Sequence, residues 1–183
     1  PIPSRGLGDV YKRQDDERRQ PEQLLQIFVS RKINVYDCTP SQLEALFEYC
    51  PDEQKSCIPN LAVGGEAISH KLWYKITDVC AANQRAALNL YGPTECTVDS
   101  TYSVIDSKDR PNIGKPMPNY RCRVVDSHGG LVPVGAVGEL WIAGAGVTMG
   151  YLNRSELTAE KFVQLQKICL LYTSDAADDV GCV

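Results

Sequence analysis

Two hydrophobic periods alternate along residues 21–91, and this alternation restricts the fold more than any other feature of the sequence. Segments with apolar residues at helical spacing are interrupted by short segments with the length and composition of buried strands. The predicted elements are a helix over 21–32, a strand over 33–38, a helix over 39–50, a strand over 60–65, a helix over 68–81 and a strand over 86–91. The joins are short, so the pattern predicts an α/β fold in which crossover helices connect the strands of a parallel sheet.

Local signals support two of these helices. Thr39 is a preferred N-cap residue, Pro40 suits the first helical position, and Gln42 can complete a capping box. On the helix over 68–81, we expect Trp73 and Tyr74 to pack in the core rather than to stack on a ligand.

The carboxyl ends of the predicted strands are the expected ligand site, because open parallel sheets bind ligands there. These ends fall near Asp37, near the glycine pair at 64–65 and over 91–95. In the last of them, "YGPTE", the Tyr91 ring can stack on a purine and the Glu95 carboxylate suits Mg²⁺ shared with phosphates. Taken alone, the same five residues are more typical of a structural turn, because a Gly-Pro turn followed by a surface glutamate is common.

Composition excludes several classes of protein. The net charge is −4, with 19 basic and 23 acidic residues in no long block, which argues against a nucleic-acid surface. No apolar run reaches the length of about 18 residues that a membrane span requires. The eight cysteines include no Cys-x-x-Cys pair, so we expect buried free thiols and a cytoplasmic location.

After residue 100 the pattern changes to strands separated by turns rich in proline and glycine. Strands are expected over 101–105, 120–126 and 138–144, followed by a helix near 155–162. The glycine-rich segment 144–150 is expected to be a turn rather than a phosphate cradle, because its spacing is not G-x-G-x-x-G. These features predict a second, smaller β-rich unit, part of a barrel or folded sheet.

The expected domain organisation has four parts. Residues 15–100 form an α/β subdomain fragment and residues 101–166 a β-rich subdomain fragment. Residues 1–14 and 167–183 fit neither half and resemble translated sequencing-adapter DNA, so both are expected to be non-native.

Four segments in order resemble the adenylation domains of nonribosomal peptide synthetases. They are "LAVGGEAIS" (61–69), "NLYGPTECT" (89–97), "NIGKPMPN" (112–119) and "GELWIAGAGVTMGYLNRSELTAEKF" (138–162). The resemblance covers roughly residues 20–165 and implies the large N-terminal domain of the adenylate-forming superfamily, which includes acyl-CoA ligases and luciferases.

The resemblance implies a two-step activity in secondary metabolite biosynthesis. An amino acid and ATP would give an aminoacyl adenylate and pyrophosphate, with Mg²⁺ as cofactor. The aminoacyl group would then pass to the phosphopantetheine thiol of a carrier domain, with carrier and condensation domains of the same synthetase as partners.

The resemblance also assigns roles to the strand-end residues. Asn89 would hydrogen-bond the adenine, Tyr91 would stack on it, Thr94 would contact the α-phosphate and Glu95 would hold Mg²⁺, which makes Thr94 and Glu95 the catalytic pair. The full nucleotide-binding set would be Gly64, Gly65, Glu66, Asn89, Tyr91, Gly92 and Thr94.

The side-chain pocket for the amino acid follows from the same register. It would be lined by Asp37, Ala62, Gly64, Leu90, Val98 and Asp99. Two unpaired carboxylates would be costly to bury beside an apolar substrate, so they favour Gln, Glu, Arg, Lys or ornithine. The alternative is that backbone N–H groups satisfy one of the aspartates.

Other motifs of the family, including its phosphate loop and the lysine of its C-terminal domain, are not found in the chain. We therefore expect an internal fragment that does not turn over substrate alone. Two alternatives stay open: a fragment of an acyl- or aryl-CoA ligase, and a non-catalytic nucleotide-binding or interaction module. Flanking genomic sequence would distinguish them.

Overall fold

The computed structural model describes residues 21–163. The segments 1–14 and 167–183, which the sequence sets apart, lie outside the described residues.

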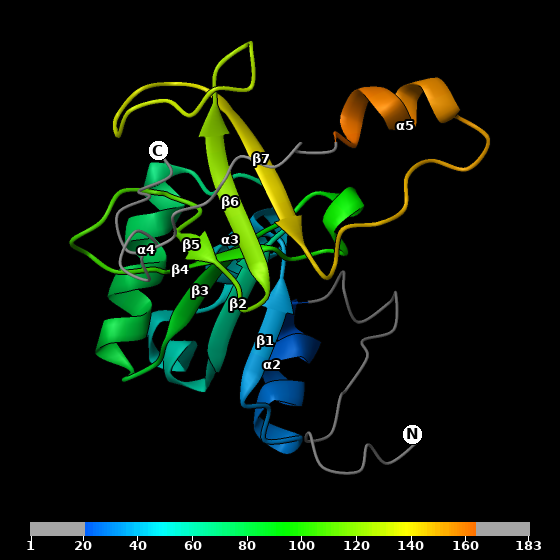
Figure 1. The fold of residues 1–183 in the computed structure, drawn as a ribbon. Helices are drawn as coiled ribbons and strands as arrows, with labels where there is room; N and C mark the ends of the chain where they lie inside the picture. Colours follow the sequence, from blue (N-terminus) through cyan, green and yellow to red (C-terminus); the bar gives the residue numbers. More distant parts are fainter. Residues whose placement is uncertain (1–20, 164–183) are drawn as a thin grey trace.

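The first part of the chain alternates helices and strands as predicted (Figure 1). Its elements are α2 (Pro21–Ser30), β1 (Val35–Cys38), α3 (Pro40–Tyr49), the 3₁₀ helix η1 (Asp52–Cys57), β2 (Asn60–Gly64), α4 (His70–Ala82) and β3 (Ala87–Tyr91). The capping box of α3 is confirmed: the Gln42 N–H donates to Thr39 Oγ1 and the Thr39 N–H donates to Gln42 Oε1, both at 3.4 Å.

The sheet is mixed rather than wholly parallel. Strands β1, β2 and β3 are parallel neighbours, whereas β4 (Thr101–Val104) and β5 (Lys115–Pro116) continue the sheet in antiparallel pairs. We expected residues 101–105 to open the β-rich unit, but β4 pairs with β3. The link over 92–100 is too short for a crossover helix, so the chain turns back beside the strand it has just left.

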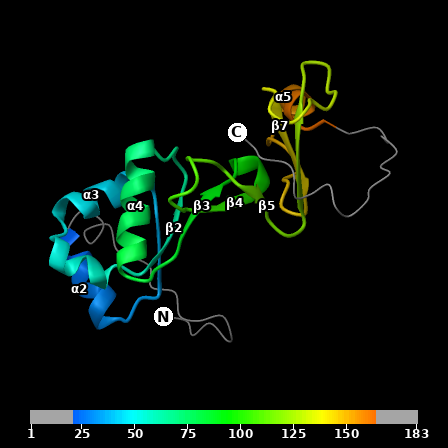
Figure 2. The ribbon, with the colours of Figure 1, turned by 90° about the vertical axis from the view of Figure 1, so that its left-hand side faces the viewer.

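Helices α2, α3 and α4 lie together on one face of the sheet (Figure 2). The strand residues that face them, such as Tyr36, Leu61 and Val63, are buried. Trp73 of α4 has no exposed surface, and its indole N–H donates to the Asp106 carbonyl at 3.0 Å, so the prediction that it packs in the core is confirmed. Tyr74 differs from the prediction, because its side chain is 45% exposed.

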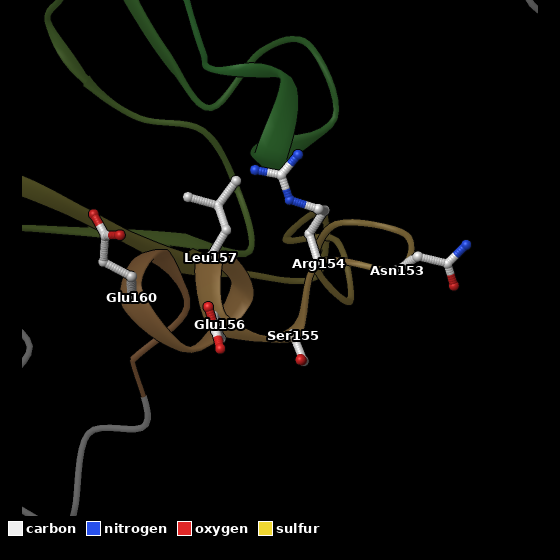
Figure 3. Close-up of a pocket in the computed structure, with 6 residues that line it drawn as sticks. All are labelled: Asn153, Arg154, Ser155, Glu156, Leu157 and Glu160. Atoms are coloured by element: carbon white, nitrogen blue, oxygen red, sulfur yellow. The ribbon is translucent and has the colours of Figure 1, made fainter.

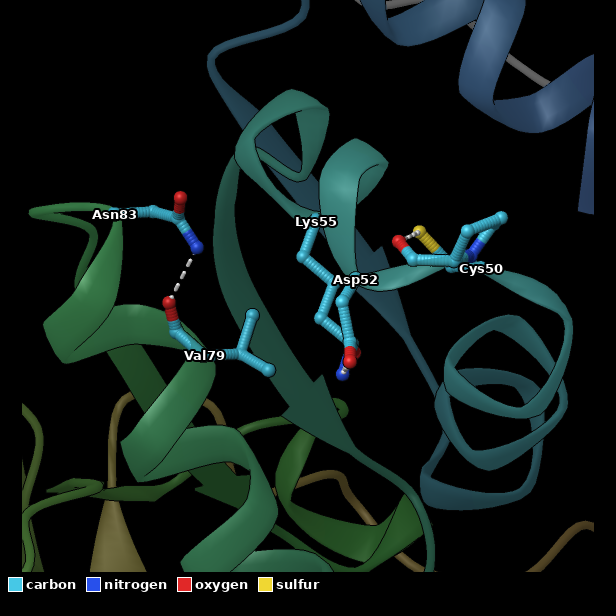
Figure 4. A network of polar contacts seen from close by, with 6 residues as sticks. Cys50, Asp52, Lys55, Val79 and Asn83 are labelled. Carbon is cyan, nitrogen blue, oxygen red and sulfur yellow. Dashed lines mark hydrogen bonds and ion pairs between the residues drawn. The ribbon is translucent and has the colours of Figure 1, made fainter.

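Local polar contacts hold the segments that lead into β2 and β3 (Figure 4). Lys55 and Asp52 form an ion pair in η1, and the Asn83 amide donates to the Val79 carbonyl at 2.8 Å at the end of α4. Because η1 precedes β2 and α4 precedes β3, these contacts lie at the edge of the sheet opposite to the expected ligand site.

The second part of the chain consists of β6 (Tyr120–Val125), β7 (Glu139–Gly144) and the short helix α5 (Ser155–Lys161). β6 and β7 form an antiparallel two-stranded sheet with a register from Tyr120 opposite Gly144 to Val125 opposite Glu139. The strands of residues 21–163 close into no barrel. Within the same residues, no helix has the length and apolar content that crossing a membrane demands.

Candidate functional site

The three parallel strands bring their carboxyl ends side by side. Asp37 of β1 is opposite Ala62 of β2, and Gly64 of β2 is opposite Leu90 of β3. Because side chains alternate between the faces of a strand, these four residues share the face that the helices leave open. Asp37 is exposed and the other three are half-buried. The fold therefore places four of the six predicted pocket residues together.

The remaining pocket residues, Val98 and Asp99, come from the loop that follows β3. Val98 is 71% exposed, and its backbone has a φ of 75°. Burial raises the pKa of the Asp99 carboxyl, and the negative charge of Asp37 raises this pKa further. The two acids are therefore near enough to interact, and no described residue donates a hydrogen bond to either carboxylate.

Two glycines permit close backbone contacts at this edge. A Cβ at Gly64 would lie 2.9 Å from the Leu90 carbonyl oxygen, and a Cβ at Gly92 would lie 2.3 Å from the Val98 carbonyl oxygen. The loop over 92–99 is also closed by Ser100, whose N–H and hydroxyl both donate to the Tyr91 carbonyl, at 2.9 and 3.2 Å. A side chain at Gly64 would press against β3, and a side chain at Gly92 would press against the end of the loop over 92–99.

The loop after β2 is held through Glu66. The Glu66 carboxylate accepts hydrogen bonds from the backbone N–H of Ser41, at 3.2 Å, and from the Ser41 hydroxyl. These bonds lower the pKa of Glu66 and place its charge at the N-terminus of α3. The Glu66 carboxylate is thus engaged with α3, and the role of this loop toward a nucleotide stays a prediction.

Asn89 and Tyr91 differ in accessibility. Asn89 is 7% exposed, and its amide donates to the Asn112 carbonyl at 2.7 Å, whereas Tyr91 is 38% exposed. The Tyr91 ring is therefore open to a partner at the end of β3. The assignment of Asn89 to adenine stays a prediction, and it would require the amide to serve both the carbonyl and the base.

Glu95 lies in a one-turn 3₁₀ helix, η2 (Thr94–Cys96), that β3 and its loop lead into. The Tyr151 hydroxyl donates to Glu95 Oε1, and this bond is the main reason that the pKa of Glu95 is lowered. The carboxylate is therefore charged at neutral pH and keeps acceptor capacity for another partner.

Segment 144–151 lies against η2, although the sequence indicated only a turn there. The Thr97 hydroxyl donates to the Gly146 carbonyl at 2.6 Å, and the Thr148 N–H donates to the Glu95 carbonyl at 2.8 Å.

Sequence reasoning assigned no role to Tyr151. The available signal was its place in the longest segment of the family resemblance, directly after Gly150, whose φ is 125°.

The polar groups at η2 suit Mg²⁺, which needs few protein ligands. They do not suit a metal ion that is held by protein groups alone. The residues described contain no group of three or more His, Cys, Asp or Glu that could hold a metal ion. Mg²⁺ commonly takes one or two carboxylates and completes its shell with waters and substrate phosphates. A single charged Glu95 beside the Thr94 hydroxyl suits that arrangement.

A depression in the surface at the start of α5 contains none of the predicted site residues (Figure 3). It is lined by Asn153, Arg154, Ser155, Glu156, Leu157 and Glu160. Its side chains come from one short helix and the turn before it, and none of them comes from the strand ends.

Comparison with known proteins gives a consistent result. The model of the family described as AMP-binding enzyme matches residues 5–152. The chain is 38% identical over 149 residues to the AMB antimetabolite synthetase AmbE of Pseudomonas aeruginosa, covering 80% of this chain and 7% of the relative. It is 38% identical over 148 residues to a dimodular nonribosomal peptide synthase of Bacillus subtilis, covering 79% of this chain and 6% of the relative.

Solved structures include a four-domain nonribosomal peptide synthetase bound to AMP and glycine. It superposes with a TM-score of 0.70 at 32% identity, covering 82% of this chain and 11% of that chain. The chain thus spans less than a tenth of the length of the two sequence relatives and about a tenth of this structure.

Proposed function

The chain belongs to the AMP-binding enzyme family, and we propose that it is the part of an amino-acid-activating adenylation domain that binds the nucleotide and the substrate side chain. The observation that carries this proposal is that Tyr91, at the end of β3, and Glu95, in η2, follow one another at the carboxyl edge of the parallel strands. An aromatic ring and a charged acid a few residues apart can flank a nucleotide, with the base beside the ring and the phosphates beside the acid.

In the proposed reaction, a carboxylate oxygen of the amino acid attacks the α-phosphorus of ATP and pyrophosphate leaves. The chain contributes by positioning and by complementing charge. Tyr91 would orient the base, and the Thr94 hydroxyl would donate a hydrogen bond to an α-phosphate oxygen. Glu95 would hold Mg²⁺, which when bound neutralises phosphate charge. The backbone of the Gly64–Gly65 loop would lie along the nucleotide.

We place the substrate side chain on the open sheet face between Asp37 and Asp99. The repulsion between these acids is relieved by a cationic or hydrogen-bonding side chain, so Arg, Lys, ornithine and Gln are favoured over Leu or Phe. A Glu substrate would bring a third carboxylate and would need a proton or a cation between it and the two acids.

The proposed partners are the domains that would use the adenylate. A carrier domain with a phosphopantetheine thiol would receive the aminoacyl group, and a condensation domain would follow.

We propose a cytoplasmic setting, where ATP is available. Burial raises the pKa of the Cys80 thiol to about 11, which keeps this cysteine inert.

The test is calorimetric titration of the chain with ATP in the presence and absence of Mg²⁺. Tyr91→Ala should weaken binding by about 1–3 kcal/mol, the worth of a stacked base. Tyr74→Ala, on a tyrosine of α4 that is 45% exposed against 38% for Tyr91, is the matched control and should leave binding unchanged. Glu95→Gln should remove the Mg²⁺ dependence, whereas Glu53→Gln in η1 should preserve it. Absence of binding, or equal effects within each pair, would contradict the proposal.

A further inference from the structure

The backbone around Glu95 is held in a conformation that it would not adopt unaided. Thr97 and Val98, directly after η2, have φ values of 57° and 75°. Both residues are β-branched, and a non-glycine residue in this region costs about 1–3 kcal/mol. Such a conformation persists only where the surrounding structure determines it.

Contacts from the second part of the chain supply that restraint. The Tyr120 hydroxyl donates to the Cys96 carbonyl at 2.6 Å, and Gly146 and Thr148 bond the turn on either side of it. These three contacts involve backbone atoms or the Thr97 hydroxyl, so they fix the path of the turn. They do not fix the direction of the Glu95 carboxylate.

Tyr151 is the residue that reaches the carboxylate itself. Its hydroxyl donates to Glu95 Oε1. Its backbone N–H donates to the Thr158 hydroxyl at 2.9 Å, and its ring meets the Phe162 ring edge-on at a centroid distance of 5.6 Å. The backbone of Tyr151 is therefore held by the middle of α5 and its ring by the residue that follows α5, while its hydroxyl holds Glu95.

We infer that Tyr151 is a positioning residue, which fixes one orientation of the Glu95 carboxylate for Mg²⁺ and is itself set in place by α5. The role of Glu95 in this inference rests on the proposed function. The hydrogen bond between Tyr151 and Glu95 does not depend on that function. A glutamate side chain has three rotatable bonds, and one hydrogen bond to Oε1 selects among their combinations. Tyr151 thereby leaves the other oxygen to face the nucleotide.

The family match ends at residue 152, one residue after Tyr151. Helix α5 and Phe162 lie beyond it. The inference thus extends the site from the strand ends to a helix that none of the predicted site residues belongs to.

The first experiment measures the Glu95 side chain in the full chain without ligand, by NMR couplings that report its χ1 rotamers. The unaltered chain should show one dominant rotamer, and Tyr151→Phe should show averaging. Tyr120→Phe is the matched control, because it removes a tyrosine hydroxyl from the same turn without touching the carboxylate. Averaging in the unaltered chain, or equal behaviour of the two variants, would overturn the inference whatever the nucleotide does.

The second experiment titrates Mg²⁺ at a fixed ATP concentration and follows nucleotide binding. Loss of an outer-shell hydrogen bond costs about 10–100-fold in metal affinity, so Tyr151→Phe should raise the half-saturating Mg²⁺ concentration about tenfold. Thr158→Val should act in the same direction but less, and Tyr120→Phe should not act. If Glu95→Gln has no effect, the proposed function fails. If Glu95→Gln acts and Tyr151→Phe matches Tyr120→Phe, only the inference fails.

Discussion

The two parts of the molecule are stabilised in different ways. The buried apolar residues of the α/β part form one cluster that runs from Leu24 to Ile105 and includes the fully buried Trp73. In the described residues after 105, Val125 is the one buried apolar side chain, while Val134 and Val137 are 84% and 99% exposed. The first part therefore has a core of its own, and the second depends on hydrogen bonds and on contacts with its neighbours.

Both parts of the molecule fix the positions of the proposed site residues, but in different ways. The α/β part supplies the ligand-facing residues, because a packed sheet fixes the strand ends from which they project. The weaker part supplies a restraint on the path of η2, through Tyr120, and a restraint on the Glu95 carboxylate, through Tyr151. A site at such a join is sensitive to both parts, although only one of them carries the chemistry.

The largest expected effect comes from comparing the two tryptophans, one in each part. Trp73→Ala should lower the free energy of unfolding by about 3–5 kcal/mol, because it empties a fully buried site. Trp141→Ala, at a half-buried position of β7, should cost about 1 kcal/mol, the average for a point substitution. Urea unfolding followed by circular dichroism measures both. Equal losses would show that the second part has a core of comparable strength.

Hydrogen exchange should resolve the same contrast without any substitution. Amides of β2 and β3 should exchange only through global unfolding, whereas amides of β6 and β7 should exchange through local opening. A difference in protection of about 100-fold, or about 2.8 kcal/mol, is expected. Uniform protection across both sheets would remove the distinction between the two parts.

Gly92→Ala should disturb the loop over 92–99, which follows β3 and carries Glu95. The new Cβ would lie 2.3 Å from the Val98 carbonyl oxygen, and such overpacking costs about 1–3 kcal/mol. Gly135→Ala is the control: its Cβ meets nothing within 4 Å, so only the positive φ of 86° is penalised, by about 1–2 kcal/mol. The decisive readout is ATP binding, which Gly92→Ala should weaken and Gly135→Ala should not.

The fold of the first part could be predicted because each of its signals is local. Helical spacing, the capping box at Thr39 and the strand-end glycines all lie within a few residues of the structure that they specify. The antiparallel pairing of β4 was missed because it depends on how the loop over 92–100 closes on Tyr91. The contact between Tyr151 and Glu95 was missed for the same reason. It joins residues 56 positions apart, and no periodic pattern reports such a distance.

The smallest expected effect concerns Asp99, and its sign follows from the direction of the pKa shift. Burial and the charge of Asp37 raise the pKa of Asp99 in the folded chain, so the folded state binds a proton more tightly than the unfolded chain. This carboxyl therefore favours folding at low pH and opposes it once the pH rises through the ordinary carboxyl range.

Asp99→Asn removes the penalty, and the variant should gain stability relative to the unaltered chain between about pH 4 and pH 7. Solvent screening of a half-buried group should keep the gain below about 1 kcal/mol. Urea midpoints measured across that range test the sign. Asp109→Asn, on an exposed acid between β4 and β5, is the control and should show no such gain. If Asp99→Asn is less stable than the unaltered chain at pH 7, the Asp99 carboxylate has a stabilising partner in the folded chain. The preference of the open sheet face for a cationic substrate would then lose its basis.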